Sequence, residues 1–368
     1  MKILVRLGAL FDAERLIPIS SAHVSGVSYK TLGDAPIEFL KALADAEAKA
    51  KVKTTLNPQS LDQEYLIKRL PRHLCQRQLD ILKQFERMGL APSLTCTPYY
   101  LESPKPGAHL AWAESSAVVY ANSVLGARTN REGGPSALAA AIIGKTPDYG
   151  MHKTEDRQPN IQVRIEPQLK NETEFGALGI CLGKLLGNKI PAIHGLRNAP
   201  KDKLKQFSAA LATTGMTDMF KHETSSGSKG IEKMSVENKE IRQTIEDLST
   251  SSTFEPDLVF IGCPHCSLSE IRRIARLVDA KKVKDRTEFW VCTSRCIKEK
   301  AREYVQKIEN TGGHVLADVC TVVSWTEKIG INTIMTNSAK TAYYAPTLNK
   351  AQTTLAPLKE CLTAALKE

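Results

Sequence analysis

The sequence contains no long hydrophobic run. Nowhere in its 368 residues do about 18 apolar side chains follow one another, which is the length that a transmembrane helix needs. The chain begins MKILVR over Met1–Arg6, and this apolar run is too short for a signal peptide. We therefore expect a cytoplasmic protein with no membrane span.

The basic residues do not form runs either. The formal net charge is +10, from 50 Lys and Arg against 40 Asp and Glu, but the lysines are spread through helical segments such as 41–53 and 199–205. No Lys/Arg run is interleaved with aromatic side chains, which argues against a nucleic-acid partner. An acidic protein subunit or an anionic small molecule remains compatible with this charge.

Cysteine usage argues against a disulfide framework. Nine Cys, an odd number, in a chain of intracellular character indicate free or metal-bound thiols. Cys75, Cys181 and Cys361 lie in helical or apolar surroundings, and we interpret them as buried side chains. The other thiols are candidate metal ligands.

Length and composition indicate an α/β protein of several lobes. The chain is long enough for two or three lobes, and 42% hydrophobic against 24% charged residues suffice for a buried core. We expect an N-terminal α/β lobe with substrate loops at 1–200 and a polar connecting segment at 201–254. A C-terminal α/β lobe that carries several of the cysteines is expected at 255–368.

The C-terminal lobe has the clearest pattern. Strand-like apolar runs lie at Asp257–Gly262, Glu288–Cys292, His314–Val319 and Ile331–Thr336. Helical patterns at 267–279 and 297–309 fill the first two gaps between them. This alternation of strand and helix predicts a parallel sheet with right-handed crossovers.

Three cysteines stand at or just past the carboxyl ends of these strands. Cys263, Cys292 and Cys320 are spaced by 29 and 28 residues, which matches successive βαβ units. Ligands of open α/β sheets bind at such ends, so the thiols could converge on zinc or on an iron–sulfur cluster. Two alternatives stay open: each thiol is a small buried side chain, or Cys263, Cys266, Cys292 and Cys296 form a zinc site of a non-enzymatic protein.

Residues 89–160 are dense in Gly, Pro, Ser, Asn and Tyr, and long loops of this kind are usually functional. A helix is predicted over Ser136–Ile143, because Pro135 favours its first turn and Gly144 its end. Its N-terminus, with Arg128 and Arg131 nearby, is a candidate anion site. A capped surface helix with solvated arginines is the alternative.

Two side chains are candidates for acid–base chemistry. Glu114 stands between Trp112 and the pair Ser115-Ser116, where it could be a general base, a metal ligand or a hydrogen-bonded structural carboxylate. His23 lies in the small polar stretch 20–26, although a lone His is more often structural than catalytic.

Several segments resemble the aconitase X family, a divergent branch of the aconitase superfamily. They read SSAHVSGVSY at 20–29, CTPY at 96–99, AWAESSA at 111–117, NSVLGARTNREGG at 122–134, GCPH at 262–265, DVC at 318–320 and TNSAK at 336–340. The signature over 111–134 is highly specific, whereas GCPH alone would be weak. The resemblance covers nearly the whole chain.

This resemblance implies an aconitase-like α/β large subunit of several lobes, with parallel-type sheets flanked by helices. The family has a single-chain form that acts on cis-3-hydroxy-L-proline and a split form that acts on mevalonate 5-phosphate in the archaeal mevalonate pathway of isoprenoid biosynthesis. The chain ends at Glu368, soon after the segment 336–340, which favours the split form. We thus expect a large subunit that lacks the swivelling domain and forms a heterodimer with a small subunit that carries it.

The activity implied is that of a hydro-lyase, which dehydrates mevalonate 5-phosphate to anhydromevalonate phosphate. The hydroxyproline or another hydroxy acid is the alternative substrate. An iron–sulfur cluster, 4Fe-4S or 3Fe-4S as isolated, would act as the Lewis acid. The resemblance carries its ligands over to Cys96, Cys263 and Cys320, and it gives Cys292 no ligand role.

The same resemblance suggests which other side chains serve the reaction. Glu114 and His23 are expected to be catalytic, while the base that removes the substrate proton is expected on the small subunit. Substrate binding is expected from Ser21, Ser115, Ser116, Asn130, Arg131 and Lys340.

Overall fold

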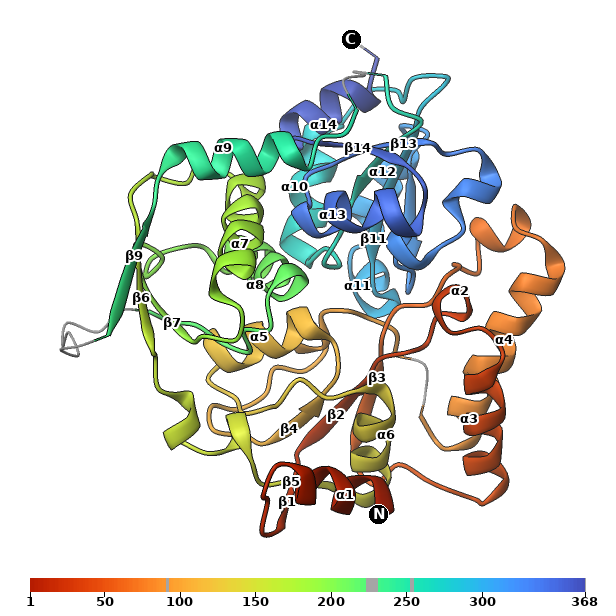
Figure 1. The fold of residues 1–368 in the computed structure, drawn as a ribbon. Coiled ribbons are helices and arrows are strands. Elements are labelled where there is room, and N and C mark those ends of the chain that lie inside the picture. Colours follow the sequence, from red (N-terminus) through yellow and green to blue (C-terminus); the bar gives the residue numbers. More distant parts are fainter. Residues whose placement is uncertain (91–92, 223–230, 252–254, 368) are drawn as a thin grey trace. The chain divides into compact units, whose positions relative to one another are not determined.

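The computed structural model describes residues 1–90, 93–222, 231–251 and 255–367 (Figure 1). The chain forms two compact units. The first comprises Met1–Ser25, Lys49–Thr55 and Pro98–Thr244, and the second comprises Gly26–Ala48, Leu56–Thr97 and Ile245–Glu368. Each unit is therefore built from segments that are distant in the sequence.

The N-terminal part of the first unit is organised by a small sheet. Its elements are α1 (Lys2–Leu10), β1 (Leu16–Pro18), β2 (Ser21–Val24), β3 (Lys53–Leu56), β4 (Leu110–Trp112), α5 (Ser115–Ser123), α6 (Gly134–Ile143) and β5 (Lys145–Pro147). The sheet has the order β3-β2-β4, and β2 runs parallel to β4 with His23 opposite Trp112. Ala140 and Ala141 of α6 pack in one core with Ala22 of β2, because their small side chains allow close approach.

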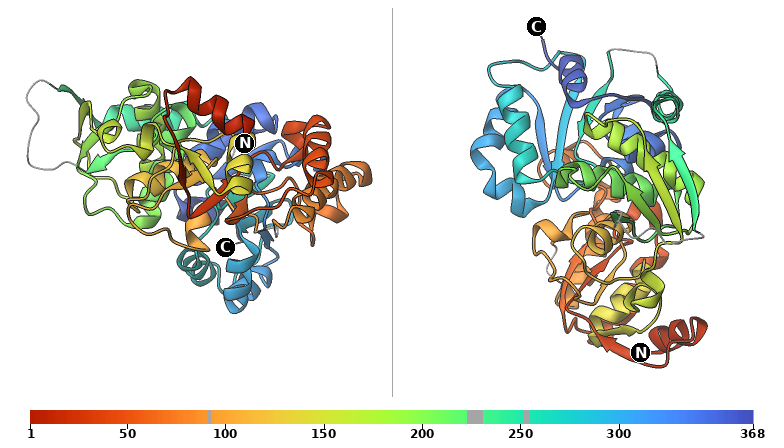
Figure 2. Two further views of the ribbon diagram at one scale, coloured as in Figure 1. Left: turned by 90° about the horizontal axis from the view of Figure 1, so that it is seen from below. Right: turned by 90° about the vertical axis from the view of Figure 1, so that its left-hand side faces the viewer.

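A second sheet forms the rest of the first unit. Its elements are β6 (Ile161–Ile165), α7 (Glu172–Leu186), β7 (Pro191–His194), α8 (Lys201–Thr214), β8 (Lys221–His222), β9 (Glu232–Val236) and α9 (Asn238–Asp247). The strands are parallel in the order β8-β7-β6-β9. Figures 1 and 2 show α7 and α8 together on one face of this sheet, as expected when successive right-handed crossovers run in one direction.

Helices α7 and α8 touch backbone to backbone. A Cβ atom built on Gly179 would lie 2.6 Å from the carbonyl oxygen of Phe207, and one on Gly183 would lie 2.8 Å from that of Leu211. Both distances are too short for real atoms, so glycine is required at these positions for steric reasons. This contact fixes the spacing of the two helices, which in turn cover the sheet.

The second unit contains a five-stranded parallel sheet and an added helical pair. Its elements are α2 (Tyr29–Leu32), α3 (Ala35–Asp45), α4 (Arg72–Arg87), β10 (Leu258–Ile261), α10 (Leu268–Leu277), β11 (Glu288–Thr293), α11 (Arg295–Lys300), α12 (Arg302–Glu309), β12 (His314–Ala317), β13 (Thr333–Thr336), α13 (Ala339–Leu348), β14 (Gln352–Leu355) and α14 (Leu358–Ala365). All four residues of β10 are buried, as the central strand of a parallel sheet requires.

The strand order of this sheet reverses direction next to β10. The order is β12-β11-β10-β13-β14, so the chain first builds outward from β10 to β12 and then returns to the other side of β10. Right-handed crossovers in opposite directions put α10 and α12 on one face and α13 on the other (Figure 2). The carboxyl ends of β10 and β13 therefore flank a topological switch point, where α/β sheets bind their ligands.

The four strands expected in the C-terminal lobe are confirmed as β10 to β13, and the helix expected over Ser136–Ile143 is α6. The polar connection expected at 201–254 is different in the structure, because α8 begins at Lys201 and buries Phe207 and Leu211 completely. Lysine, serine and threonine between these apolar positions make the helical spacing of the apolar residues hard to recognise in the sequence. Residues 223–230 and 252–254, within the expected connection, lie outside the described residues.

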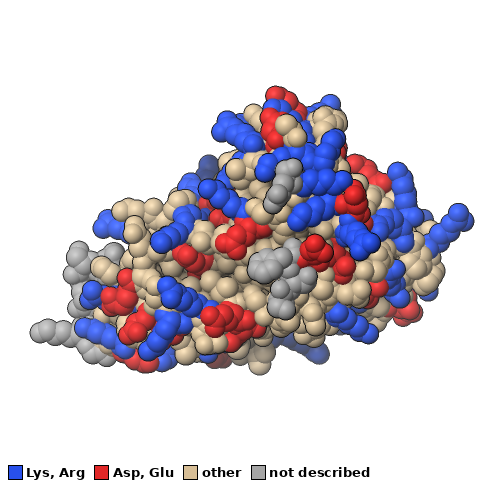
Figure 3. Space-filling model, turned by 90° about the horizontal axis from the view of Figure 1, so that it is seen from above, with Lys and Arg blue, Asp and Glu red and all other residues tan. Residues whose placement is uncertain are grey.

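Charge and hydropathy of the folded chain agree with the composition. Over the described part of the chain, no helix combines the length and the apolar character that crossing a membrane demands. On the face drawn in Figure 3, Lys and Arg side chains alternate with Asp and Glu rather than forming one uninterrupted basic surface.

The α7–α8 contact gives a testable prediction for stability. We expect Gly179→Ala to lower the free energy of unfolding by about 1–3 kcal/mol, because the methyl group has no space against α8. Gly8→Ala in α1 is the matched control, since its Cβ would meet its nearest neighbour, Pro147, at 3.4 Å. The free energy of unfolding of the control is expected to rise by up to about 1 kcal/mol, because alanine has a higher helix propensity than glycine. Urea unfolding followed by circular dichroism measures both, and equal stability of the two variants would contradict the steric argument.

Candidate functional site

Three loops of the second unit carry the cysteines that the sequence singles out as cluster ligands. Cys263 follows β10, Cys320 follows β12, and Cys96 lies in the loop after α4. The first two leave the same edge of the sheet because their strands are parallel. Thr95 joins its loop to this unit by donating its backbone N–H to the carbonyl oxygen of Leu56 at 2.8 Å.

Direct contacts bring the three loops together. The backbone N–H of His265, two residues after Cys263, donates to the Sγ atom of Cys96 at 3.2 Å. Burial raises the pKa of the Cys320 thiol, the neighbouring Cys263 thiol raises it further, and the positive charge of Lys340 lowers it. Cys320 is thus close enough to both groups to respond to their charges, so Cys96, Cys263, Cys320 and Lys340 gather at one end of the sheet.

Lys340 reaches this place from the opposite side of the switch point. It lies in the first turn of α13, whose N-cap Ser338 accepts from the backbone N–H of Thr341. The helix follows β13, which pairs with β10. The structure therefore unites Lys340 with the strand-end cysteines, although 20 residues separate it from Cys320 in the sequence.

Cys292 is placed differently from the other strand-end thiols. It lies inside β11, fully buried in the hydrophobic core of the unit, and its Sγ atom contacts the hydroxyl of Thr321 at 3.8 Å. Its backbone supports the Cys263 loop instead, because its carbonyl oxygen accepts from the N–H of Cys266 at 2.9 Å. Burial raises the pKa of the Cys292 thiol, as it does for Cys320, so its position inside a strand is what sets Cys292 apart.

The four-thiolate zinc site is not formed. Cys266 is buried, while Cys296 is partly exposed on α11. Within 1–90, 93–222, 231–251 and 255–367, no group of three or more His, Cys, Asp or Glu is arranged around a single metal ion. Zinc holds its sulfur ligands at about 2.3 Å and so needs them tightly gathered, whereas a multinuclear cluster spans more widely spaced thiols.

Two polar residues beside the cysteines had no role in the sequence analysis. His265 is buried, and its ring Nε2 lies 2.9 Å from the carbonyl oxygen of Val319. Gln59 is 1% exposed, pairs with the Cys320 loop through its backbone, and its Oε1 atom is buried without a hydrogen-bond partner. The signal for His265 was its place in GCPH; no pattern around Gln59 pointed to it.

In the first unit, Ser21 and His23 lie on β2 beside β4. Trp112 of β4 donates its indole N–H to the hydroxyl of Ser21 at 3.2 Å, and its ring meets the His23 ring edge-on at a centroid distance of 6.4 Å. The His23 Nδ1 atom contacts the hydroxyl of Thr55 at 2.7 Å, and the side chain is fully buried. His23 is therefore a buried, hydrogen-bonded histidine in this structure.

Glu114 follows the end of β4 and caps α5. Its carboxylate accepts from the hydroxyl of Ser116 at 2.8 Å and from the backbone N–H of Ser116 at 3.4 Å. A carboxylate at a helix N-terminus is favourable for the helix dipole, so this position has a structural use as well as a chemical one. Ser115 is the first residue of α5 and is partly exposed beside it.

Asn130 and Arg131 lie on a segment that runs beside β4, with Arg131 opposite Trp112. The Asn130 amide accepts from the N–H of Met151 at 2.7 Å and donates to the carbonyl oxygen of Tyr149 at 3.0 Å. Arg131 donates to the carbonyl oxygens of residues 215 and 217 at 3.2 and 3.1 Å and pairs with Asp218. Both side chains thus hold neighbouring loops, and their role as substrate binders stays a prediction.

A histidine pair, with His152 buried and His109 partly exposed, lies close to Asn130. The Nδ1 atoms of His109 and His152 are 3.0 Å apart, and Arg128 donates to the carbonyl oxygen of His152 at 2.6 Å. Burial lowers the pKa of His152 to about 3, and the charges of His109, Arg157 and Arg128 contribute in the same direction. His152 is therefore neutral in the folded protein at ordinary pH.

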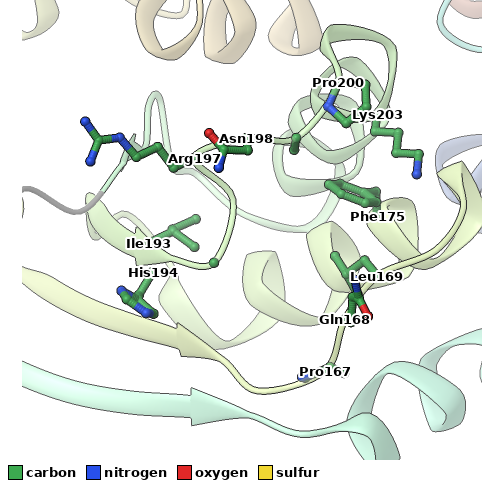
Figure 4. A pocket seen from close by; sticks show the side chains of 12 residues that line it. Pro167, Gln168, Leu169, Phe175, Ile193, His194, Arg197, Asn198, Pro200 and Lys203 are labelled. Atoms are coloured by element: carbon green, nitrogen blue, oxygen red, sulfur yellow. The ribbon is translucent and has the colours of Figure 1, made fainter.

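A recess of about 590 Å³ opens at the carboxyl ends of β6 and β7 (Figure 4). Phe175 and Lys203 lie together on one side of it, and His194 and Arg197 lie on the other. Lys203 also donates to the carbonyl oxygen of Lys170 at 2.7 Å. None of the site residues expected from the sequence lines this recess.

Family models match nearly the whole chain. The first, second and third domains of aconitase X match residues 1–155, 159–246 and 256–367. The boundaries agree with the end of the β5 region, with α9 and with the start of the five-stranded sheet.

Individual relatives agree with these models. The phosphomevalonate dehydratase large subunit of Methanocaldococcus jannaschii is 43% identical over 98% of this chain and 94% of its own length. The cis-3-hydroxy-L-proline dehydratase of Pseudomonas aeruginosa is 33% identical over 100% of this chain and 66% of its own length. The crystal structure of Thermococcus kodakaraensis aconitase X in its holo-form superimposes with a TM-score of 0.91 at 38% identity, covering 99% of this chain and 94% of that one.

The buried His152 predicts a loss of stability in acid. Between its ordinary pKa of about 6.5 and the lowered value of about 3, the unfolded chain binds a proton that the folded chain does not. The free energy of unfolding therefore falls as pH drops through this window, with a slope of about 1.4 kcal/mol per pH unit from this residue. His152→Gln is expected to make the slope shallower by that amount in urea unfolding at several pH values.

His194→Gln is the matched control, because His194 is exposed and its replacement should leave the slope as it is in the wild type. If the His152 variant kept the wild-type slope, His152 would not be the neutral buried group described.

Proposed function

Because this chain belongs to the aconitase X family of hydro-lyases, we propose that it is the large subunit of a mevalonate 5-phosphate dehydratase that works with a separate small subunit. The observation that carries the proposal is the gathering of Cys96, Cys263 and Cys320 within one unit. It is supported by the relative from M. jannaschii, whose name states both the substrate class and the split into subunits.

We propose that these three thiols hold an iron–sulfur cluster. The residues present fit such a group: thiolates are its usual ligands, three of them leave one position open, and the positive charge of Lys340 lowers the pKa of Cys320 against the effect of burial. The buried Oε1 of Gln59, which lacks a partner beside the Cys320 loop, fits a site that is completed by a bound group. When bound, such a cluster supplies a Lewis acid for the departing hydroxyl.

We propose that polar side chains of this chain bind the two anionic groups of the substrate and orient it. Mevalonate 5-phosphate carries a carboxylate and a phosphate, and Lys340 supplies a positive charge beside the proposed cluster ligands. Arg131 has five N–H donors; its Nη1 and Nη2 groups bind one carbonyl oxygen each and its Nε faces Asp218, so we propose that the second N–H of Nη1 or Nη2 serves an anion. Ser21, Ser115, Ser116 and Asn130 are proposed to orient the substrate by hydrogen bonds.

Proton movements are the remaining requirement. The proton to be removed lies on the carbon next to the substrate carboxylate, and we propose that its base is on the small subunit. Glu114 and His23 are proposed as the catalytic residues of this chain. The Glu114 carboxylate accepts a hydrogen bond from the Ser116 hydroxyl. The same carboxylate oxygen is proposed to take or return a proton. His23 can hold a proton between its ring and Thr55.

The first test is turnover with and without the small subunit. We expect dehydration of mevalonate 5-phosphate by the two subunits purified together without oxygen, with iron and sulfide bound, and no turnover by this chain alone. Full activity of the isolated chain would exclude the split site. If the complex holds a cluster but dehydrates cis-3-hydroxy-L-proline instead of mevalonate 5-phosphate, cis-3-hydroxy-L-proline is the substrate.

Cysteine variants test the ligand assignment. Cys96→Ser, Cys263→Ser and Cys320→Ser are each expected to lower iron and sulfide content and to reduce activity by at least about 100-fold, since loss of a ligand should exceed the effect of losing an outer partner. Cys292→Ser and Cys361→Ser are matched controls, because both thiols are fully buried in the second unit. If Cys292→Ser lost iron while Cys361→Ser kept it, Cys292 would be a ligand of the cluster.

A further inference from the structure

His265 connects the three loops that carry the proposed ligands. Its backbone N–H donates to Cys96 Sγ at 3.2 Å, and its ring Nδ1 lies 3.4 Å from the hydroxyl of Thr95, the residue before Cys96. Its ring Nε2 lies 2.9 Å from the carbonyl oxygen of Val319, the residue before Cys320. The residue itself lies two positions after Cys263, so one side chain contacts the immediate neighbours of both other cysteines.

The partners of the ring decide its protonation. A carbonyl oxygen only accepts, so the Nε2 atom that faces Val319 carries the hydrogen. In that tautomer the Nδ1 atom accepts from the Thr95 hydroxyl, so the two ends of the ring make different hydrogen bonds. A buried ring, 1% exposed, with both nitrogens engaged is held in one orientation.

We propose that His265 is a positioning residue for the iron–sulfur cluster, which fixes Cys96, Cys263 and Cys320 at the spacing that one cluster requires. This inference rests on the proposed function. Outer partners orient metal ligands, and N–H donation to a ligand sulfur favours its thiolate form and tunes the cluster. The ring contacts the Val319 carbonyl oxygen and the Thr95 hydroxyl, while the residue's own N–H donates to Cys96.

Cys292 shows by contrast why the loops need such a link. It sits inside a strand whose ladder hydrogen bonds fix it, and it pairs with Leu316 of β12. Cys96, Cys263 and Cys320 all lie outside the strands, and isolated backbone hydrogen bonds, such as Thr95 to Leu56 and Cys320 to Gln59, support their loops. A single imidazole that spans from the Thr95 hydroxyl to the Val319 carbonyl adds a direct side-chain link between these loops.

The test compares three variants of the complex with the small subunit, purified without oxygen. His265→Ala removes both ring contacts, whereas His265→Gln keeps an amide N–H that can reach the Val319 carbonyl oxygen. His314→Gln is the matched control, since His314 is another histidine of this unit, half-buried at the start of β12, where it stacks on Tyr65. The readouts are iron and sulfide per chain, the electron paramagnetic resonance spectrum of the cluster, and the urea midpoint of unfolding.

We expect His265→Ala to weaken iron retention by about 10- to 100-fold and to alter the cluster spectrum. His265→Gln is expected to recover much of the iron content, and His314→Gln to match the wild type. Wild-type iron content and an unchanged spectrum in His265→Ala would overturn the proposal.

Two further results separate the possible failures. If His265→Ala does not fold, Thr95→Val is compared with Thr97→Val, because the Thr95 hydroxyl contacts both Nδ1 and Thr97, whereas the Thr97 hydroxyl contacts that of Thr95. Iron retention reduced in the Thr95 variant alone, at an unchanged unfolding midpoint, supports the positioning role, and unchanged or equally reduced retention in the two variants overturns it. If the wild-type complex itself holds no iron and sulfide, both the proposed function and this inference are wrong. If the wild-type complex holds a cluster and the His265→Ala variant holds it equally well, only the inference about His265 is wrong.

Discussion

Parallel pairing of β10 with β11 on one side and β13 on the other is the constraint on which the second unit depends. The pairing obliges every loop that leaves a strand to emerge at the same edge, so side chains far apart in the sequence become neighbours there. It also reverses the direction of winding between β10 and β13, which puts Cys263 and Lys340 on the two sides of the switch point. The nearness of Cys263 and Lys340 is therefore a consequence of strand order.

The sequence predicts this sheet well because its strands are continuous apolar runs interrupted by amphipathic helices. Cys263 and Cys320 could be found from their positions after such runs. Cys96 could not, since its loop follows no strand of the sheet and meets the Cys263 loop through the backbone N–H of His265, so it needed the family resemblance. Cys292 lies near a strand end too, but inside β11 rather than after it, a difference that the spacing of the cysteines does not reveal.

The polar residues of the first unit could be predicted as a group but not in their roles. Glu114 caps a helix, Asn130 binds two backbone groups of a neighbouring loop, and Arg131 binds two carbonyl oxygens. The partners of Asn130 and Arg131 come from segments about 20 to 85 residues away, which no local pattern reveals. Side chains that hold a loop and side chains that bind a substrate use the same chemistry, so residue type alone does not separate them.

The glycine contact between α7 and α8 also limits how the chain can vary in length. Successive residues of a helix are rotated by about 100°, so inserting or deleting one residue before Gly179 would turn both glycines away from α8 and bring bulkier side chains against its backbone. The loops before Glu172 and after Leu186 have no such requirement. Insertions and deletions among homologous chains should consequently collect in those loops, while the helix between them keeps its length.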